Sequence, residues 1–204
     1  HANPEHQRYL RKFLDDFCDK MMASISAGAQ KLAVEPDAVV EEAQQHLRFA
    51  LVRAKKFTST SSTKRVEDAA ERYFRPDAEN GTAKEEESGT ALVIYGRSGA
   101  GKTYLLSKIM ARCLDAPAAG GCVVIRFLGT TPRSSNVRAL LTSLCGQLRR
   151  AYGKEAEVPS EFQDLRAYFA EAVKEWPSAE QPLTLFIDSV DQLDDSNGGR
   201  RLEW

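Results

Sequence analysis

The sequence predicts an α/β fold: a parallel sheet flanked by helices, incomplete at its C-terminal end and preceded by an N-terminal helical segment. Three observations predict it. Short β-branched and apolar runs alternate with longer segments in which apolar residues recur at helical spacing. A glycine-rich stretch, GRSGAGKT, separates the first run from the helical pattern after it, and the third run ends in acids, LTLFIDSVDQLDD. Strands that alternate with helices form parallel sheets covered by helices.

Amphipathic helices are expected ahead of the sheet. Asn3 and Pro4 suit the start of the first helix, whose apolar stripe comprises Leu10, Phe13, Leu14, Phe17, Met21 and Ile25. A second helix follows Pro36 and Asp37, and its apolar side comprises Val39, Val40, Ala43, Leu47, Ala50, Leu51 and Ala54. After a polar loop at 57–63, residues 66–74 predict a short helix. We therefore expect an N-terminal helical region at 1–75 and a flexible linker at 76–90, rich in Pro, Gly and charge.

Residues 91–95, ALVIY, predict the first strand, and GRSGAGKT follows directly. GxxxxGK followed by threonine is the pattern of a phosphate-binding loop. We expect Gly96, Gly99 and Gly101 to adopt positive φ and to bring backbone N–H groups close to a ligand. A helix that starts near Lys102 adds its dipole and its unpaired first-turn donors. The predicted ligand is therefore a phosphate.

The candidate nucleotide-binding residues are those of the loop and the first helical turn: Gly96, Arg97, Ser98, Gly99, Ala100, Gly101, Lys102, Thr103 and Tyr104. Lys102 is expected to reach the β- and γ-phosphates as a catalytic residue, and the Thr103 hydroxyl to bind Mg²⁺. A glycine-rich surface turn with an unrelated lysine is the alternative. The predicted strand before the loop and helix after it favour nucleotide binding.

Two further strands and two helices complete the predicted domain, which spans residues 91–204. CVVIRFLG predicts a second buried strand, and Ser135 or Asn136 caps the next helix. A helix from Ser160 has Gln163 in position for a capping box. The third strand, LTLFID, ends at Asp188. An acid at the carboxyl end of a central strand lies beside the phosphate loop, so Asp188 is expected to bind the metal together with Thr103.

The residues after Asp188 predict slow ATP hydrolysis. Fast ATPases commonly place a glutamate there to polarise the attacking water, whereas this chain has Ser189. Asp191 is the nearest alternative carboxylate and hence a second catalytic candidate. The sequence contains no NKxD tetrapeptide to read guanine, so the expected cofactors are ATP or ADP with Mg²⁺.

The composition indicates which kinds of partner and which cellular compartment the chain is suited to. The net charge of −1 gives no indication of nucleic-acid binding. No apolar run approaches the roughly 18 residues that a membrane span needs. Four separated cysteines without a CxxC pair, and only three histidines, suggest reduced thiols in a cytoplasmic protein. Because the chain begins with His1, we expect it to be a piece of a longer protein.

Three segments resemble the NACHT-type P-loop modules of the signal-transducing STAND class, as found in NACHT and WD-repeat proteins: ALVIYGRSGAGKT, VVIRFLGTTPRSSNVRALLTSLCGQL and LTLFIDSVDQLDD. The upstream helices are also similar, so the resemblance covers nearly the whole chain. It implies an adenine-nucleotide switch with weak ATPase activity that oligomerises, or joins a larger assembly through its parent chain. It assigns phosphate and Mg²⁺ to Lys102 and Thr103, the metal to Asp188 and the second acidic position to Asp191.

The chain departs from that family at two positions. A Gly-Arg pair often lies near the adenine, where this chain has Phe57 to Thr60, and a glutamate often follows the second acid, where it has Gln192. The family's sheet also continues beyond the strand that ends in Asp188. Two alternatives remain open: a P-loop kinase or housekeeping ATPase that acts on a small substrate, and a nucleotide-binding scaffold without turnover.

Overall fold

The computed structural model describes residues 12, 16, 18–22, 37–74, 91–115, 121–201 and 204. The chain divides into two units, His1–Ala38 and Val39–Trp204. In the first unit residues 18–22 are helical, but most of the predicted first helix lies outside the described residues, as does the predicted linker at 76–90. The account below concerns the second unit.

The sheet of the second unit pairs two parallel strands, β1 (Cys122–Phe127) and β2 (Leu183–Asp188). The register runs from Cys122 opposite Leu183 to Phe127 opposite Asp188. Between them the chain forms α5 (Val137–Ala151) and α6 (Phe162–Lys174), which make the crossover that a parallel pair requires. The predicted parallel α/β arrangement is therefore confirmed for these two strands.

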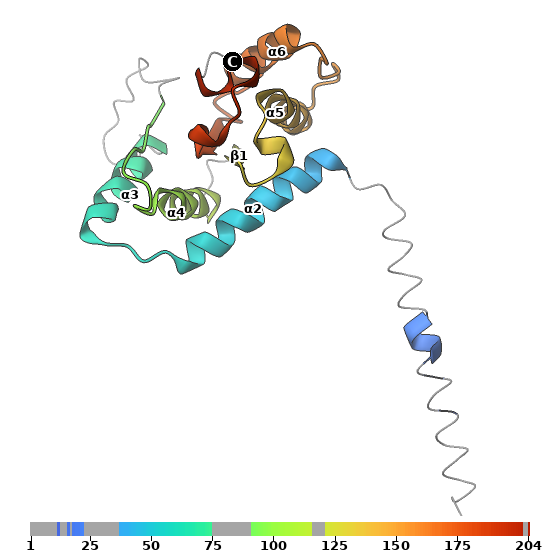
Figure 1. Cartoon of the computed structure of the whole chain (residues 1–204), viewed down its shortest axis with the longest axis horizontal. Helices are drawn as coiled ribbons and strands as arrows, with labels where there is room; N and C mark the ends of the chain where they lie inside the picture. The colour runs from blue at the N-terminus through green and yellow to red at the C-terminus, as the bar shows by residue number, and fades with distance from the viewer. Residues whose placement is uncertain are drawn as a thin grey trace, which may run out of the picture. The chain divides into compact units, whose positions relative to one another are not determined.

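Side chains from the two faces of the sheet enter two apolar clusters. Val124 of β1 packs in one cluster with Leu141 of α5 and Leu165 of α6. Ile125 and Phe127, which alternate with Val124, belong to a second cluster with residues of α2 (Ala38–Lys56), α3 (Ser61–Phe74) and α4 (Lys102–Asp115). Figure 1 shows these elements and their order along the chain. Burial on both faces explains why β1 begins with four consecutive apolar residues, CVVI.

The prediction of a first strand at residues 91–95 is wrong. These residues have no strand conformation, and the described part of the sheet contains only β1 and β2. Val93 and Tyr95 are 73% and 91% exposed, and only Ile94 packs against the second cluster. An apolar run indicates a tendency to be buried, but a strand also needs a neighbour that pairs with its backbone.

Two helix starts also differ from the prediction. α3 begins at Ser61, inside the predicted polar loop, because Thr60 and Thr63 form a reciprocal cap. The N–H of Thr63 donates to Thr60 Oγ1 at 3.2 Å, and the N–H of Thr60 donates to Thr63 Oγ1 at 2.8 Å. The capping box predicted at Ser160 does not form, since α6 starts at Phe162 after Glu161, whose side chain makes no cap bond. The cap of α5 is Asn136, as one of the two predicted alternatives, and its side chain accepts from the N–H of Ala139.

The buried face of α2 agrees only in part with the prediction, because Ala50 and Ala54 are buried as expected but other predicted residues are not. Val40, Leu47 and Leu51 are exposed, whereas Glu42 and His46 are 5% and 0% exposed. Short 3-10 turns complete the unit after each strand: η3 (Pro132–Ser134), η4 (Val190–Gln192) and η5 (Ser196–Arg201). Among the described helices, none combines the length and the apolar character needed to span a bilayer.

Candidate functional site

The glycine-rich loop has the predicted backbone at two of its three glycines. Gly99 and Gly101 adopt φ of 77° and 81°, and no atom would lie within 4 Å of a Cβ built at either position. Gly96 is not among the positive-φ residues, so that expectation is wrong for it. The loop leads directly into α4, which begins at Lys102 as predicted. Its glycines thus leave open space on the side where a ligand could approach the backbone.

The Lys102 side chain folds back over this loop. Its Nζ donates to the carbonyl oxygens of Gly96 at 2.8 Å and Arg97 at 3.0 Å. Both bonds lie within the candidate nucleotide-binding segment. An ammonium held by neutral carbonyls can exchange them for phosphate oxygens, which are stronger, charged acceptors.

Thr103 and Asp188 meet although 85 positions separate them in the sequence. The Thr103 hydroxyl donates to Asp188 Oδ2 at 2.6 Å, and Ser189 Oγ donates to the same oxygen at 3.2 Å. Asp188 is the last residue of β2 and is 9% exposed. A hydroxyl and a carboxylate are hard oxygen ligands of the kind that Mg²⁺ takes, so this pair fits a magnesium ion.

Asp191 lies apart from that pair. It belongs to η4 on the surface, and its carboxylate accepts from its neighbour Gln192 at 2.8 Å. Among the hydrogen bonds and ion pairs of the described residues, none joins Asp191 to Lys102, Thr103 or Asp188. The structure therefore brings together the predicted metal residues but not the second acid.

Arg53 at the C-terminal end of α2 lies near the start of α4, a placement that the sequence does not predict. Its guanidinium carbon is 3.2 Å from the centre of the Phe49 ring and 5.8 Å from that of Tyr104, the last candidate nucleotide-binding residue. Basic residues at a helix C-terminus ordinarily reflect the helix dipole. Only the fold shows that the Arg53 guanidinium also lies over the ring of Tyr104 in α4.

Comparison with known proteins agrees with this geometry. The profile of the AAA ATPase domain matches residues 81–200, more than half of the chain. The chain belongs to this AAA ATPase domain family. It therefore carries a nucleotide-binding NTPase module, and its AAA domain contains both the glycine-rich loop and Asp188.

Relatives of this AAA ATPase chain carry the NACHT name, which confirms the predicted NACHT-type resemblance. The chain is 27% identical over 201 residues to the mouse and human "NACHT and WD repeat domain-containing protein 2", covering 95% of this chain and 11% of each relative. It is 28% identical over 208 residues to the mouse "NACHT domain- and WD repeat-containing protein 1", covering 99% of this chain and 13% of that protein. The chain thus spans a small part of these relatives. No solved structure matches it.

Proposed function

We propose that the chain is the ATP/ADP-binding switch module of a longer NACHT-type signalling or scaffold protein, dependent on Mg²⁺, slow in hydrolysis and able to drive oligomerisation. The contact that supports this most directly is the 2.6 Å hydrogen bond between the Thr103 hydroxyl and the Asp188 carboxylate. It joins the loop that would hold the phosphates to the strand that would hold the metal. Relatives whose names contain WD repeats support the idea of a longer parent chain.

Each residue of the site has a distinct part in this proposal. The backbone N–H groups of residues 96–104 would surround the phosphates, and Lys102 would leave the carbonyls of Gly96 and Arg97 to contact the β- and γ-phosphates. Thr103 and Asp188 would hold Mg²⁺, which when bound neutralises phosphate charge. In this arrangement, Thr103 redirects its hydroxyl from Asp188 towards the ion.

Slow hydrolysis is proposed because, among the described residues, no carboxylate directly follows Asp188 as a catalytic base. Ser189 directly follows Asp188, and a hydroxyl does not take a proton from water as a carboxylate does. Asp191 is exposed and bonded to Gln192. A module with this chemistry would keep ATP bound long enough for its γ-phosphate to bias a conformational equilibrium.

Nucleotide-dependent thermal stability tests this proposal. ATP and ADP with Mg²⁺ are expected to raise the melting temperature, with a stabilisation of about 2.7 kcal/mol at 100 times Kd, and GTP less so. Lys102→Ala should abolish the shift. Lys108→Ala, which removes the same charge from the same helix, should retain it. An unchanged shift in Lys102→Ala would exclude the glycine-rich loop as the nucleotide site.

Turnover and assembly separate the switch from its alternatives. Steady-state hydrolysis at the rate of fast motor ATPases, or phosphorylation of a small molecule, would favour the housekeeping ATPase or kinase. Binding without any turnover and without a change in molecular size would favour the scaffold. The switch requires that a non-hydrolysable ATP analogue, but not ADP, increases the size of the full-length protein in light scattering.

A further inference from the structure

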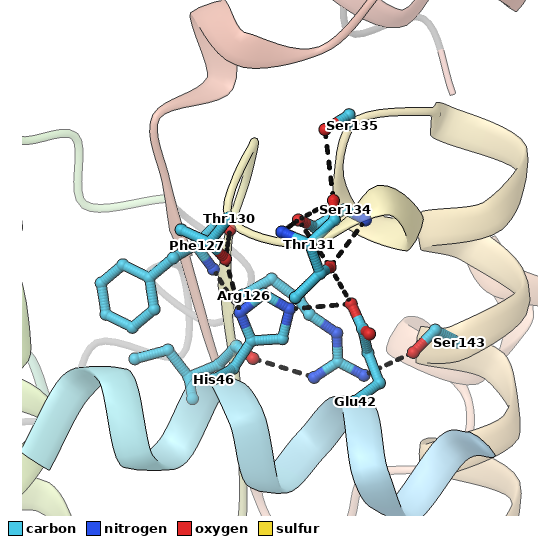
Figure 2. Close-up of polar contacts among 10 residues, drawn as sticks. Glu42, His46, Arg126, Phe127, Thr130, Thr131, Ser134, Ser135 and Ser143 are labelled. Atoms are coloured by element: carbon cyan, nitrogen blue, oxygen red, sulfur yellow. Dashed lines mark hydrogen bonds and ion pairs between the residues drawn. The ribbon is translucent and has the colours of Figure 1, made fainter.

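A buried polar cluster joins α2 to the end of β1 (Figure 2). Glu42 and His46 lie one turn apart on α2, with His46 Nε2 3.0 Å from Glu42 Oε1. The backbone N–H of Phe127, the last residue of β1, donates to His46 Nδ1 at 3.1 Å. Because Nδ1 accepts this bond, neutral His46 carries its proton on Nε2 and donates it to Glu42. Both ring nitrogens are thus committed to specific partners.

Glu42 extends this cluster to the β1 loop, which we define as residues 128–135. The Thr131 hydroxyl donates to Glu42 Oε1 at 2.5 Å. Thr131 is itself fixed, because its side chain accepts from the N–H of Ser134 while Ser134 Oγ accepts from the N–H of Thr131. This reciprocal cap makes the turn η3 rigid. α2 therefore holds a well-ordered loop by directional bonds.

The charge of Glu42 lies close to a buried cation. Arg126 is 0% exposed, and its guanidinium donates to Ile125 O at 2.8 Å and to Ser143 Oγ at 3.0 Å. Burial lowers the pKa of Arg126 to about 10, and the Glu42 charge opposes that effect. Replacing buried charged groups by apolar side chains of similar volume is often neutral or stabilising. The directional bonds of the polar cluster instead fix the position of α2 relative to the β1 loop.

The β1 loop in turn holds the acidic segment, residues 188–194, at both ends. The N–H of Leu128 donates to Asp188 O at 3.1 Å, and the N–H of Asp194 donates to Ser135 O at 2.9 Å. Between these bonds Gly129, with φ of 76°, packs so closely that a Cβ there would lie 2.8 Å from Gln192 Cβ. A displacement of the loop therefore moves the segment that contains both predicted acids.

We propose that Glu42 and His46 are positioning residues through which α2 sets the placement of the acidic segment relative to the glycine-rich loop. The proposal rests on the nucleotide-switch function proposed above. It makes α2 the element that orients the metal and γ-phosphate side of the site. Loosening this connection should change the preference for ATP over ADP, because only ATP places a γ-phosphate there.

Three variants of the full-length protein test the coupling. Glu42→Leu removes the acceptor for His46 and Thr131, and Thr131→Val removes one hydroxyl with little change in volume. In both, the ratio of the ADP and ATP dissociation constants, measured with fluorescent analogues and Mg²⁺, should shift by about 3- to 10-fold. Glu42→Gln keeps an oxygen that accepts both bonds, so it should leave the ratio within about twofold of wild type even if its melting temperature falls.

Two controls separate positioning from a general loss of stability. Leu165→Ala removes a buried side chain of the apolar cluster that contains Val124. It should lower the melting temperature without changing the ratio of the two dissociation constants. Gly129→Ala should displace Gln192 from the other end of the connection and change the ratio while α2 stays intact.

An unchanged ratio in Thr131→Val and Gly129→Ala, with wild type binding both nucleotides, refutes the coupling alone. A wild type that binds neither nucleotide refutes the proposed function, and the coupling with it.

Discussion

Ser189 has a backbone conformation that serine rarely adopts, directly beside the Asp188 carboxylate. Its φ of 60° and ψ of 46° are left-handed, and its hydroxyl donates to Asp188 Oδ2 at 3.2 Å. This conformation costs an L-residue about 1–2 kcal/mol, because Cβ approaches the following carbonyl. The turn lets the chain leave β2 sharply and form η4. Local strain at this position is therefore part of how the acidic segment is shaped.

Substitutions at Ser189 should reveal that strain. Ser189→Gly removes the Cβ and should keep or raise the free energy of unfolding. Ser189→Val adds a second branch at Cβ and should lower it by about 1–2 kcal/mol relative to glycine. Urea unfolding of both variants measures the difference. Equal stability of the two would mean that the left-handed turn does not form in solution.

At the residue scale, the sequence predicted the parts of the site that follow a fixed spacing. Lys102 and Thr103 belong to a pattern whose spacing is dictated by the ligand, and Asp188 ends a strand whose position relative to the loop follows from the parallel fold. The contact between Thr103 and Asp188 agrees with that reasoning. Glu42 and His46 gave no comparable signal, because polar residues one turn apart on a helix ordinarily face solvent. Their burial depends on β1 and its loop, more than 80 positions away.

At the element scale, the position of α2 depends on a glycine in another helix. Gly146 is buried within α5, and a Cβ there would lie 2.9 Å from Val39 Cγ2. Glycine is unfavourable inside a helix by about 1 kcal/mol relative to alanine. Its presence here is explained by the close approach of the first turn of α2. This contact fixes the N-terminal end of the helix that carries Glu42 and His46.

A double-mutant cycle tests this packing. Gly146→Ala should destabilise the wild-type protein, because Val39 is stiff at χ1 and overpacking costs about 1–3 kcal/mol. In a Val39→Ala background the same change should become neutral or stabilising by up to about 1 kcal/mol, the gain in helix propensity. Urea unfolding of all four proteins gives the coupling energy. If Gly146→Ala raised stability equally in both backgrounds, the two helices would not touch there.

Helices could be predicted where caps and hydrogen bonds between nearby residues determine them. Strands were harder to predict, because a strand also depends on backbone pairing with a distant strand. The sequence predicted α4 from Lys102, and α5 with a cap at Ser135 or Asn136, because helix bonds and caps lie within a few residues. The sequence did not predict the start of α3, because a reciprocal cap between Thr60 and Thr63 looks the same in the sequence as a polar loop. It assigned a strand to residues 91–95, whose exposed Val93 and Tyr95 show that an apolar run does not ensure pairing.

On the scale of the whole second unit, His46 links stability to pH. It contacts both the α2 carboxylate of Glu42 and the end of β1, so its charge state affects the packing of α2 on the sheet. Burial is the main cause that lowers the pKa of His46 from 6.5, and the positive charge of Arg126 lowers it further. The hydrogen bond and charge of Glu42 act in the opposite direction. The Thr130 hydroxyl also faces the ring, 3.5 Å from Nδ1.

These shifts give the direction of the pH dependence. The unfolded chain binds a proton at His46 near pH 6.5, and the folded chain does so only at lower pH. The contribution is therefore complete above pH 6.5 and is lost as the pH falls towards the folded pKa, by at most about 1.4 kcal/mol per pH unit. His46→Asn keeps an acceptor for the Phe127 N–H but does not titrate. In urea unfolding between about pH 5 and pH 8, wild type should lose stability with falling pH more steeply than this variant. Parallel curves would show that folding does not shift the pKa of His46.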